Sequence, residues 1–192
     1  MADIAGKRGA GNMWRIAGWG AAVALLAAPF VAMQLHAEGV NWTLSDFIFA
    51  GLLFATVGGL LELAVRLSQN ASYRAGAATA LLAGLLVVWS NLAVGIVGSE
   101  DNPLNLLFFS ALLIGIVIAA VGRFRATGMA SATIGTAVSL AFAFLIATSF
   151  GTDEPNVSHW IELAGISIFA LLFTGSAALF RRAGRLQSSS SS

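Results

Sequence analysis

His159 and Glu162 are the two side chains of this sequence whose types and spacing come closest to a metal site. They stand three residues apart, so on a helix they share one face, where an imidazole and a carboxylate can bind a divalent cation. His36 and three further acids, Asp46, Glu100 and Asp101, are expected on the same side of the fold. Alternatively, these acids cap helix N-termini and complement the helix dipole. A divalent cation is therefore the one cofactor to consider, and no other is predicted.

Glu62 and Asn91 are polar residues inside apolar stretches. Residues 47–61 make about 22 Å of helix, which is shorter than the ~30 Å hydrocarbon core. A span extended to Arg66 therefore places Glu62 inside the membrane edge, either as a proton or ion site or as an anchor paired with Arg66. Asn91 lies six residues before the end of its stretch at Val97 and serves either interhelical hydrogen bonding or a pore. The predicted polar core or transport path comprises Asn91, Glu62, Ser90, Asn105, Glu100, Asp101 and Asp46.

The elements that must position these residues are membrane helices. Hydrophobic residues make up 58% of the chain and charged residues 10%, against about a quarter charged in soluble domains. We expect an all-α, polytopic membrane helical bundle of six transmembrane helices in one domain, residues 1–185, followed by a disordered serine-rich tail, residues 186–192. The predicted spans are 14–35, 44–66, 75–97, 103–122, 128–150 and 158–180.

Motifs of soluble catalysis are missing from the sequence. There is no cysteine, which excludes disulfides and thiolate metal sites. No glycine-rich phosphate loop, Ser-His-Asp order or basic nucleic-acid patch is present, so a nucleic-acid partner is not indicated. A membrane enzyme is the function with the least support.

The distribution of charge predicts how the chain crosses the membrane. With the N-terminus in the cytoplasm, all ten Lys and Arg residues fall on the inner side, as the positive-inside rule requires. They are Lys7, Arg8, Arg15, Arg66, Arg74, Arg123, Arg125, Arg181, Arg182 and Arg185. The outer turns carry seven of the nine acids: Glu38, Asp46, Glu100, Asp101, Asp153, Glu154 and Glu162. Both termini are thus predicted to be cytoplasmic, although the basic start and first apolar run also fit a cleaved signal peptide.

Capping residues and turns mark where the predicted spans begin. Pro103 suits the first position of a helix, with Asn102 as N-cap and Asn105 placed to return a bond to that cap. Thr43 and Asp46 form a similar start. Such starts recur, with Asn156 and His159 as a third case, and three pseudo-repeated hairpins would explain them. The alternative is that every helix simply needs caps.

Small residues mark where helices touch. Ser131, Gly135, Ser139, Ala143 and Ala147 recur every four residues and form a ladder that lets another backbone approach closely. The ladder serves either the chain's own bundle or a contact with a second copy or a partner membrane protein.

The segment from Trp89 to Pro103 with Asn105, preceded by Trp42-Thr43 and Asp46-Phe47, resembles an uncharacterised family of small bacterial multispan inner-membrane proteins. The resemblance covers the second to fourth spans and implies a bacterial inner membrane, but it supplies no activity. Two hypotheses follow. The first is a small cation or solute transport or channel protein with an acidic outer face. The second is a structural or accessory membrane subunit that docks a partner through small-residue helix faces.

Overall fold

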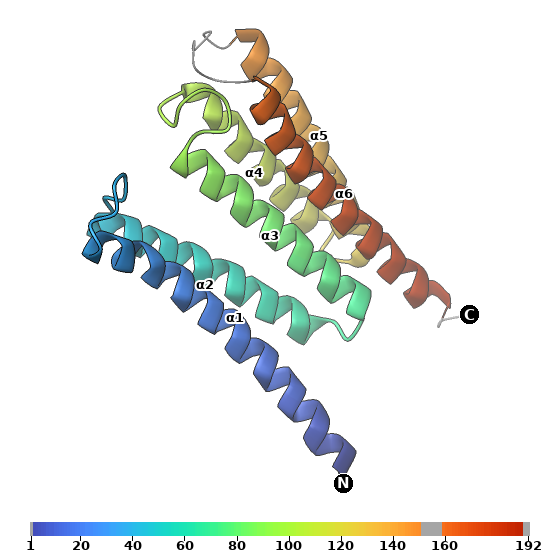
Figure 1. Ribbon diagram of the computed structural model, residues 1–192. Coiled ribbons are helices and arrows are strands. Elements are labelled where there is room, and N and C mark those ends of the chain that lie inside the picture. Colours follow the sequence, from blue (N-terminus) through green and yellow to red (C-terminus); the bar gives the residue numbers. More distant parts are fainter. Residues whose placement is uncertain (1, 151–158, 190–192) are drawn as a thin grey trace. The chain divides into compact units, whose positions relative to one another are not determined.

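The computed structural model describes residues 2–150 and 159–189, and in these ranges its regular structure is entirely helical. The helices are α1 (Ala2–Gln34), α2 (Leu44–Leu67), α3 (Ala71–Ala93), α4 (Leu106–Val121), α5 (Ala126–Phe150) and α6 (His159–Ser189), with a 3-10 turn, η1 (Pro103–Asn105), before α4 (Figure 1). Six helical stretches of the described residues are long and apolar enough to cross a membrane, the fourth of them comprising η1 together with α4. The chain is therefore a multi-pass membrane protein with the predicted all-α fold. Asp153, Glu154 and Asn156 lie outside the described residues.

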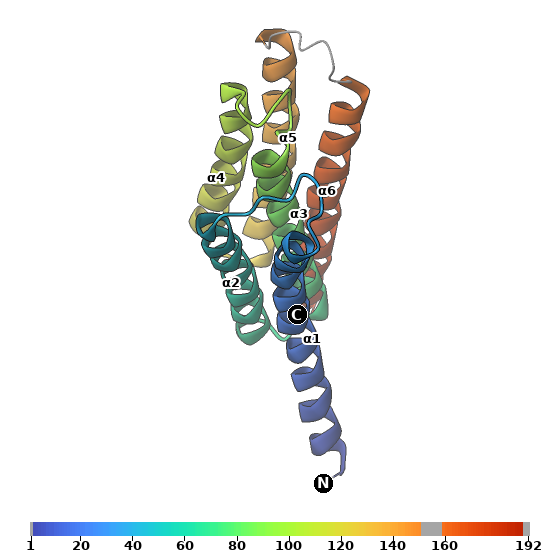
Figure 2. The same cartoon turned by 60° about the vertical axis from the view of Figure 1, so that its left-hand side comes forward.

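The chain divides into two units, residues 1–60 and residues 61–192, so the last residues of α2 belong to the second unit. In the second unit, α6 packs against α3 and α5, and α5 packs also against α4 (Figure 2). The most completely buried large side chains are Val87, Phe108, Leu140 and Phe180. Together with buried alanines of α3, α4 and α5, they form the close-packed interior of this unit.

Close approach of α3 and α6 depends on Gly76. The ring of Phe180 lies so near that a Cβ at Gly76 would meet it at 3.2 Å. One helical turn before Phe180 in α6, the Ser176 hydroxyl donates a hydrogen bond of 2.7 Å to the Gly76 carbonyl. A polar bond and an aromatic contact therefore fix the same pair of helices, as is common between membrane helices.

The predicted small-residue ladder of α5 is used in part within the second unit. A Cβ at Gly135 would lie 2.7 Å from Ile118 Cδ1 of α4, and Ala143 and Ala147 are buried. Ser139 is half-buried. Ser131 is exposed, and its hydroxyl donates to the Thr127 carbonyl of the same helix. The ladder thus packs α5 against its neighbours over most of its length, and a contact with a second copy stays a prediction.

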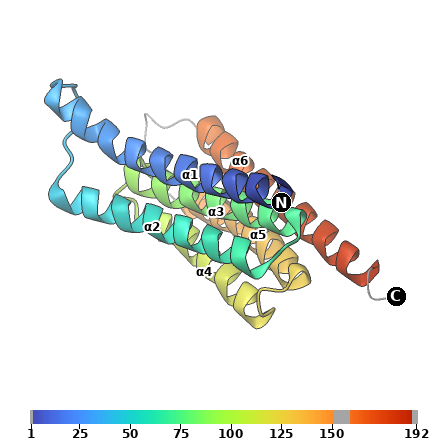
Figure 3. The ribbon, with the colours of Figure 1, turned by 90° about the horizontal axis from the view of Figure 1, so that it is seen from below.

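In the first unit, α1 leads through residues 35–43 into α2 (Figure 3). The N–H and the hydroxyl of Thr43 both donate hydrogen bonds to Asp46 Oδ2, at 2.7 and 2.8 Å. The ring centroids of Trp42 and Phe47 lie 5.1 Å apart. The predicted helix start at Thr43 and Asp46 thus resembles a capping box, because Asp46 returns a bond to the Thr43 N–H, and a hydrophobic contact lies across it. Further along α2, Trp19 of α1 packs on Gly58, where a Cβ would lie 2.9 Å from the indole.

The boundary between α3 and α4 differs from the prediction. α3 ends at Ala93, four residues before the predicted end at Val97, and α4 begins at Leu106 after the 3-10 turn. Residues 94–102, which we call the α3–α4 loop, are apolar enough at their start to extend the hydrophobic stretch. Their backbone finds hydrogen-bond partners outside a helix.

Candidate functional site: the α3–α4 loop

Asn105 is the residue around which the α3–α4 loop is folded. It is only 4% exposed. Its Oδ1 accepts hydrogen bonds from the N–H groups of Ile96 and Val97 at 3.0 and 3.1 Å, and its Nδ2 donates to the carbonyls of Ser99 and Val97 at 2.7 and 3.3 Å. One amide side chain thus satisfies backbone groups that would otherwise be buried without partners.

The predicted bond from Asn105 back to the cap was therefore wrong, whereas the predicted capping role of Asn102 is confirmed. Asn102 caps the 3-10 turn, because its Oδ1 accepts a bond of 3.0 Å from the Leu104 N–H, and Pro103 follows as the first residue. Asn105 does not return a bond to this cap. Its side chain reaches back into the loop instead, where it binds backbone groups of Ile96, Val97 and Ser99.

Two glycines allow the loop to turn back on Asn105. Gly95 and Gly98 have φ values of +74° and +69°, which side chains with a Cβ rarely adopt. A Cβ at Gly95 would also meet the Ser99 carbonyl oxygen at 2.5 Å. Between the glycines, Ile96 and Val97 bury their side chains in the core of the second unit. The loop is consequently fixed both by hydrogen bonds and by packing.

Asn91 ties the end of α3 to the same structure. Its side chain is 3% exposed, and its Nδ2 donates to the Asn105 carbonyl at 2.9 Å. Because α3 ends at Ala93, Asn91 lies two residues from the helix end and not six. The neighbouring Ser90 is half-buried, and its carbonyl accepts the Val94 N–H that closes the helix. This geometry favours hydrogen bonding within the protein over contact with a pore.

Glu162 holds the loop from the side of α6. The sequence predicted Glu162 as a metal ligand or as an acid that complements a helix dipole, and in the structure this residue is only 7% exposed. Its Oε1 accepts a bond of 2.7 Å from the Gly98 N–H, and its Oε2 lies 3.0 Å from His159 Nδ1. A buried carboxylate needs such partners, and here a backbone amide 64 positions away in the chain supplies one.

The predicted cation site is incomplete in the described part of the chain. His159 and Glu162 do meet, with the His159 side chain 65% exposed. No third His, Asp or Glu of the described residues joins them in a cluster that could hold a metal ion. Glu100 and Asp101 are exposed at the tip of the loop. The structure therefore shows a carboxylate engaged in holding the loop, and a divalent cation stays a prediction.

Glu62 and Asp46 make their hydrogen bonds to other residues than those of the α3–α4 loop. Glu62 Oε2 accepts from Arg66 Nη2 at 3.3 Å, which is the predicted pair. The pair precedes α3, whereas Asn91 is near the far end of α3, about 30 Å away along the helix axis. Asp46 belongs to the first unit and is engaged in its capping box.

Comparison with known proteins adds no candidate. No known protein family, curated protein or solved structure matches the chain. The geometry of the α3–α4 loop is therefore the basis on which a function can be proposed. That geometry also includes two residues that the sequence analysis did not single out, Gly95 and Gly98. Their spacing next to Asn102 and Asn105 is the signal that could have found them.

We expect Glu162 to matter for stability through its bond to Gly98. Glu162→Leu should lower the free energy of unfolding by about 1–2 kcal/mol, because the Gly98 N–H loses its acceptor in a partly buried position. Glu162→Gln keeps an acceptor oxygen and should cost less than half as much. His159→Ala, which removes only the exposed partner, is the matched control. Equal losses for His159→Ala and Glu162→Leu in micelle unfolding experiments would contradict the role of the Gly98 bond.

Proposed function

We propose that this chain is an accessory protein of the bacterial inner membrane that presents the α3–α4 loop to a partner protein. In this proposal the loop is on the outer side, and both termini and all Lys and Arg residues are cytoplasmic. The positive-inside distribution of charge supports that orientation. The resemblance of residues 89–105 to small bacterial multispan proteins supports the choice of membrane.

The observation that carries the proposal is the way the loop is held. Asn105 and Glu162 are buried and bind the backbone of the loop, while Glu100 and Asp101 remain exposed at its tip. A loop that is already ordered loses little conformational entropy on binding. Loops positioned by a rigid scaffold are also where proteins commonly place recognition residues. The exposed carboxylates favour a partner that offers Lys or Arg side chains.

Photo-crosslinking in intact cells tests this proposal. A crosslinking amino acid at Asp101 should give one adduct of defined mass, whereas the same group at Leu113, an exposed apolar position of α4, should not. Asn105→Ala should remove the Asp101 adduct, because the loop would lose its order. An adduct that is identical from both positions, or one that survives Asn105→Ala at normal protein levels, would contradict the proposal.

A second candidate function is cation transport, and the observation that favours it is Glu62. This carboxylate lies within the apolar helix α2, and its side chain is only 23% exposed. Ionisable residues within membrane helices commonly mark ion pathways. The purified chain in proteoliposomes distinguishes the two functions. An accessory protein should conduct cations no faster than empty liposomes, whereas a transporter should show a flux that falls when Glu62→Gln is introduced.

A further inference from the structure

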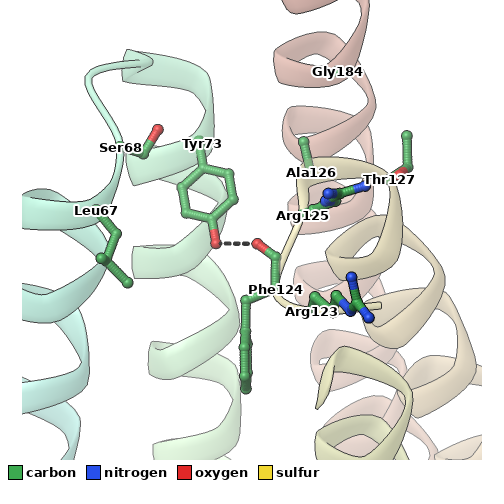
Figure 4. A pocket seen from close by; sticks show the side chains of 9 residues that line it. All are labelled: Leu67, Ser68, Tyr73, Arg123, Phe124, Arg125, Ala126, Thr127 and Gly184. Atoms are coloured by element: carbon green, nitrogen blue, oxygen red, sulfur yellow. Dashed lines mark hydrogen bonds between the residues drawn. The ribbon is translucent and has the colours of Figure 1, made fainter. Parts of the chain in front are cut away.

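A cavity of about 500 Å³ lies at the end of the second unit opposite the α3–α4 loop (Figure 4). Four parts of the chain line it: the end of α2, the first turn of α3, the segment joining α4 to α5 with the start of α5, and the last turns of α6. Because these are the ends of membrane-spanning helices, the cavity lies at the level where lipid headgroups begin.

The α4–α5 turn, residues 122–125, gives the cavity its shape. Arg123 and Phe124 have φ values of +52° and +54°, a left-handed conformation that is unfavourable for two consecutive residues other than glycine. The Tyr73 hydroxyl donates a bond of 2.7 Å to the Phe124 carbonyl, as Figure 4 shows. Strained backbone of this kind persists only where the surroundings enforce it, and it is often found at binding sites.

This turn places two guanidinium groups at the cavity. Arg123 and Arg125 are separated by one residue, and both line it. Among the residues that the structure describes, neither side chain has an acidic partner, and both arginines are exposed. Ala126 and Thr127, which also line the cavity, open α5 and bring the positive end of its dipole to the same place.

The chemistry of the lining suits a phosphate group. Guanidinium groups bind phosphate oxygens in pairs of parallel hydrogen bonds. Leu67 and Phe124, which line the same cavity as the two arginines, are apolar and exposed, as a lipid with acyl chains would require. Basic pockets between membrane helices are known places for anionic headgroups. We infer that this cavity binds a phosphate group, which the headgroup of an anionic phospholipid or free phosphate can supply.

Lipid titration of the purified full-length chain in neutral detergent, followed by native mass spectrometry, tests this inference. The chain should bind phosphatidylglycerol about tenfold more tightly than phosphatidylcholine, since only the former has a net negative headgroup. Arg123→Gln combined with Arg125→Gln should abolish that preference. Arg66→Gln, which removes an arginine that does not line the cavity, is the matched control. Arg123→Lys keeps the charge but loses the paired donors and should weaken binding only about threefold.

A second titration distinguishes the two sources of phosphate. Inorganic phosphate is added to the lipid-free protein, and binding is followed by calorimetry. Binding that depends on Arg123 and Arg125, without a preference among lipids, identifies free phosphate as the source. A lipid preference without binding of inorganic phosphate identifies the headgroup. The inference is overturned if neither probe binds, or if Arg66→Gln reduces binding as much as the double variant while all proteins unfold at the same temperature.

Discussion

Replacing Asn105 with alanine should lower the free energy of unfolding by about 3–5 kcal/mol, because several buried backbone groups lose their partners together. The N–H groups of Ile96 and Val97 and the carbonyl of Ser99 are all bound by this one side chain. Water cannot easily replace it, because Asn105 is buried. The measurement is equilibrium unfolding in mixed micelles, with helix content as the signal.

Two variants show whether the loss comes from these bonds. Asn105→Asp keeps an acceptor for Ile96 and Val97 but removes the donor to Ser99, so we expect a loss between those of wild type and Asn105→Ala. Asn102→Ala removes only the cap of the 3-10 turn and should cost about 1 kcal/mol. If Asn105→Ala cost no more than Asn102→Ala, the loop would not be folded around Asn105.

The fold could be predicted from composition because a long apolar stretch can adopt very few backbone structures in lipid. A backbone in hydrocarbon must satisfy its own hydrogen bonds, so six such stretches become six helices. The same reasoning fails where a segment is no longer helical but is still buried in the apolar interior. Ile96 and Val97 extend the hydrophobic stretch of α3, yet they lie in a loop. Hydropathy does not detect the end of the helix at this point. The backbone N–H groups of Ile96 and Val97 donate to the side chain of Asn105, which lies nine and eight residues later in the chain.

Side-chain pairs could be predicted when their partners are near in sequence. The contacts of Thr43 with Asp46, Glu62 with Arg66, and His159 with Glu162 all join residues three or four apart, and helical spacing alone brings them together. The bond from Gly98 to Glu162 joins residues far apart in the chain. It depends on the packing of α6 against the other helices, so no local pattern could place Glu162 in the interior.

The arginines of the α4–α5 turn illustrate the same limit. Their positions predict the side of the membrane on which the turn lies. Their types do not predict a left-handed backbone at Arg123 and Phe124, since that conformation favours glycine and asparagine. The conformation of the turn is enforced by two contacts. The Tyr73 hydroxyl donates a hydrogen bond to it, and Gly122 closely approaches Gly128. The cavity that results could therefore be found only in the structure.

The contact between Gly122 and Gly128 should be among the least tolerant sites in the chain. A Cβ at Gly122 would lie 2.6 Å from the Gly128 Cα, and a backbone atom cannot rotate away as a side chain can. The φ of Gly122 is −73°, so alanine fits the local conformation and any penalty reflects the contact alone. We expect Gly122→Ala to lower the free energy of unfolding by about 2–3 kcal/mol, the cost of overpacking a tight site.

Gly165 provides the matched control, because a Cβ there would meet nothing within 4 Å. Gly165→Ala lies within α6 and should be neutral or raise the stability by up to about 1 kcal/mol, since alanine loses less backbone entropy in a helix. The same micelle unfolding experiment measures both variants. A loss at Gly122 no greater than the change at Gly165 would show that the helices α4 and α5 can separate without cost. The contact would then not be what fixes the turn that carries Arg123 and Arg125, and phosphate binding should survive Gly122→Ala unchanged.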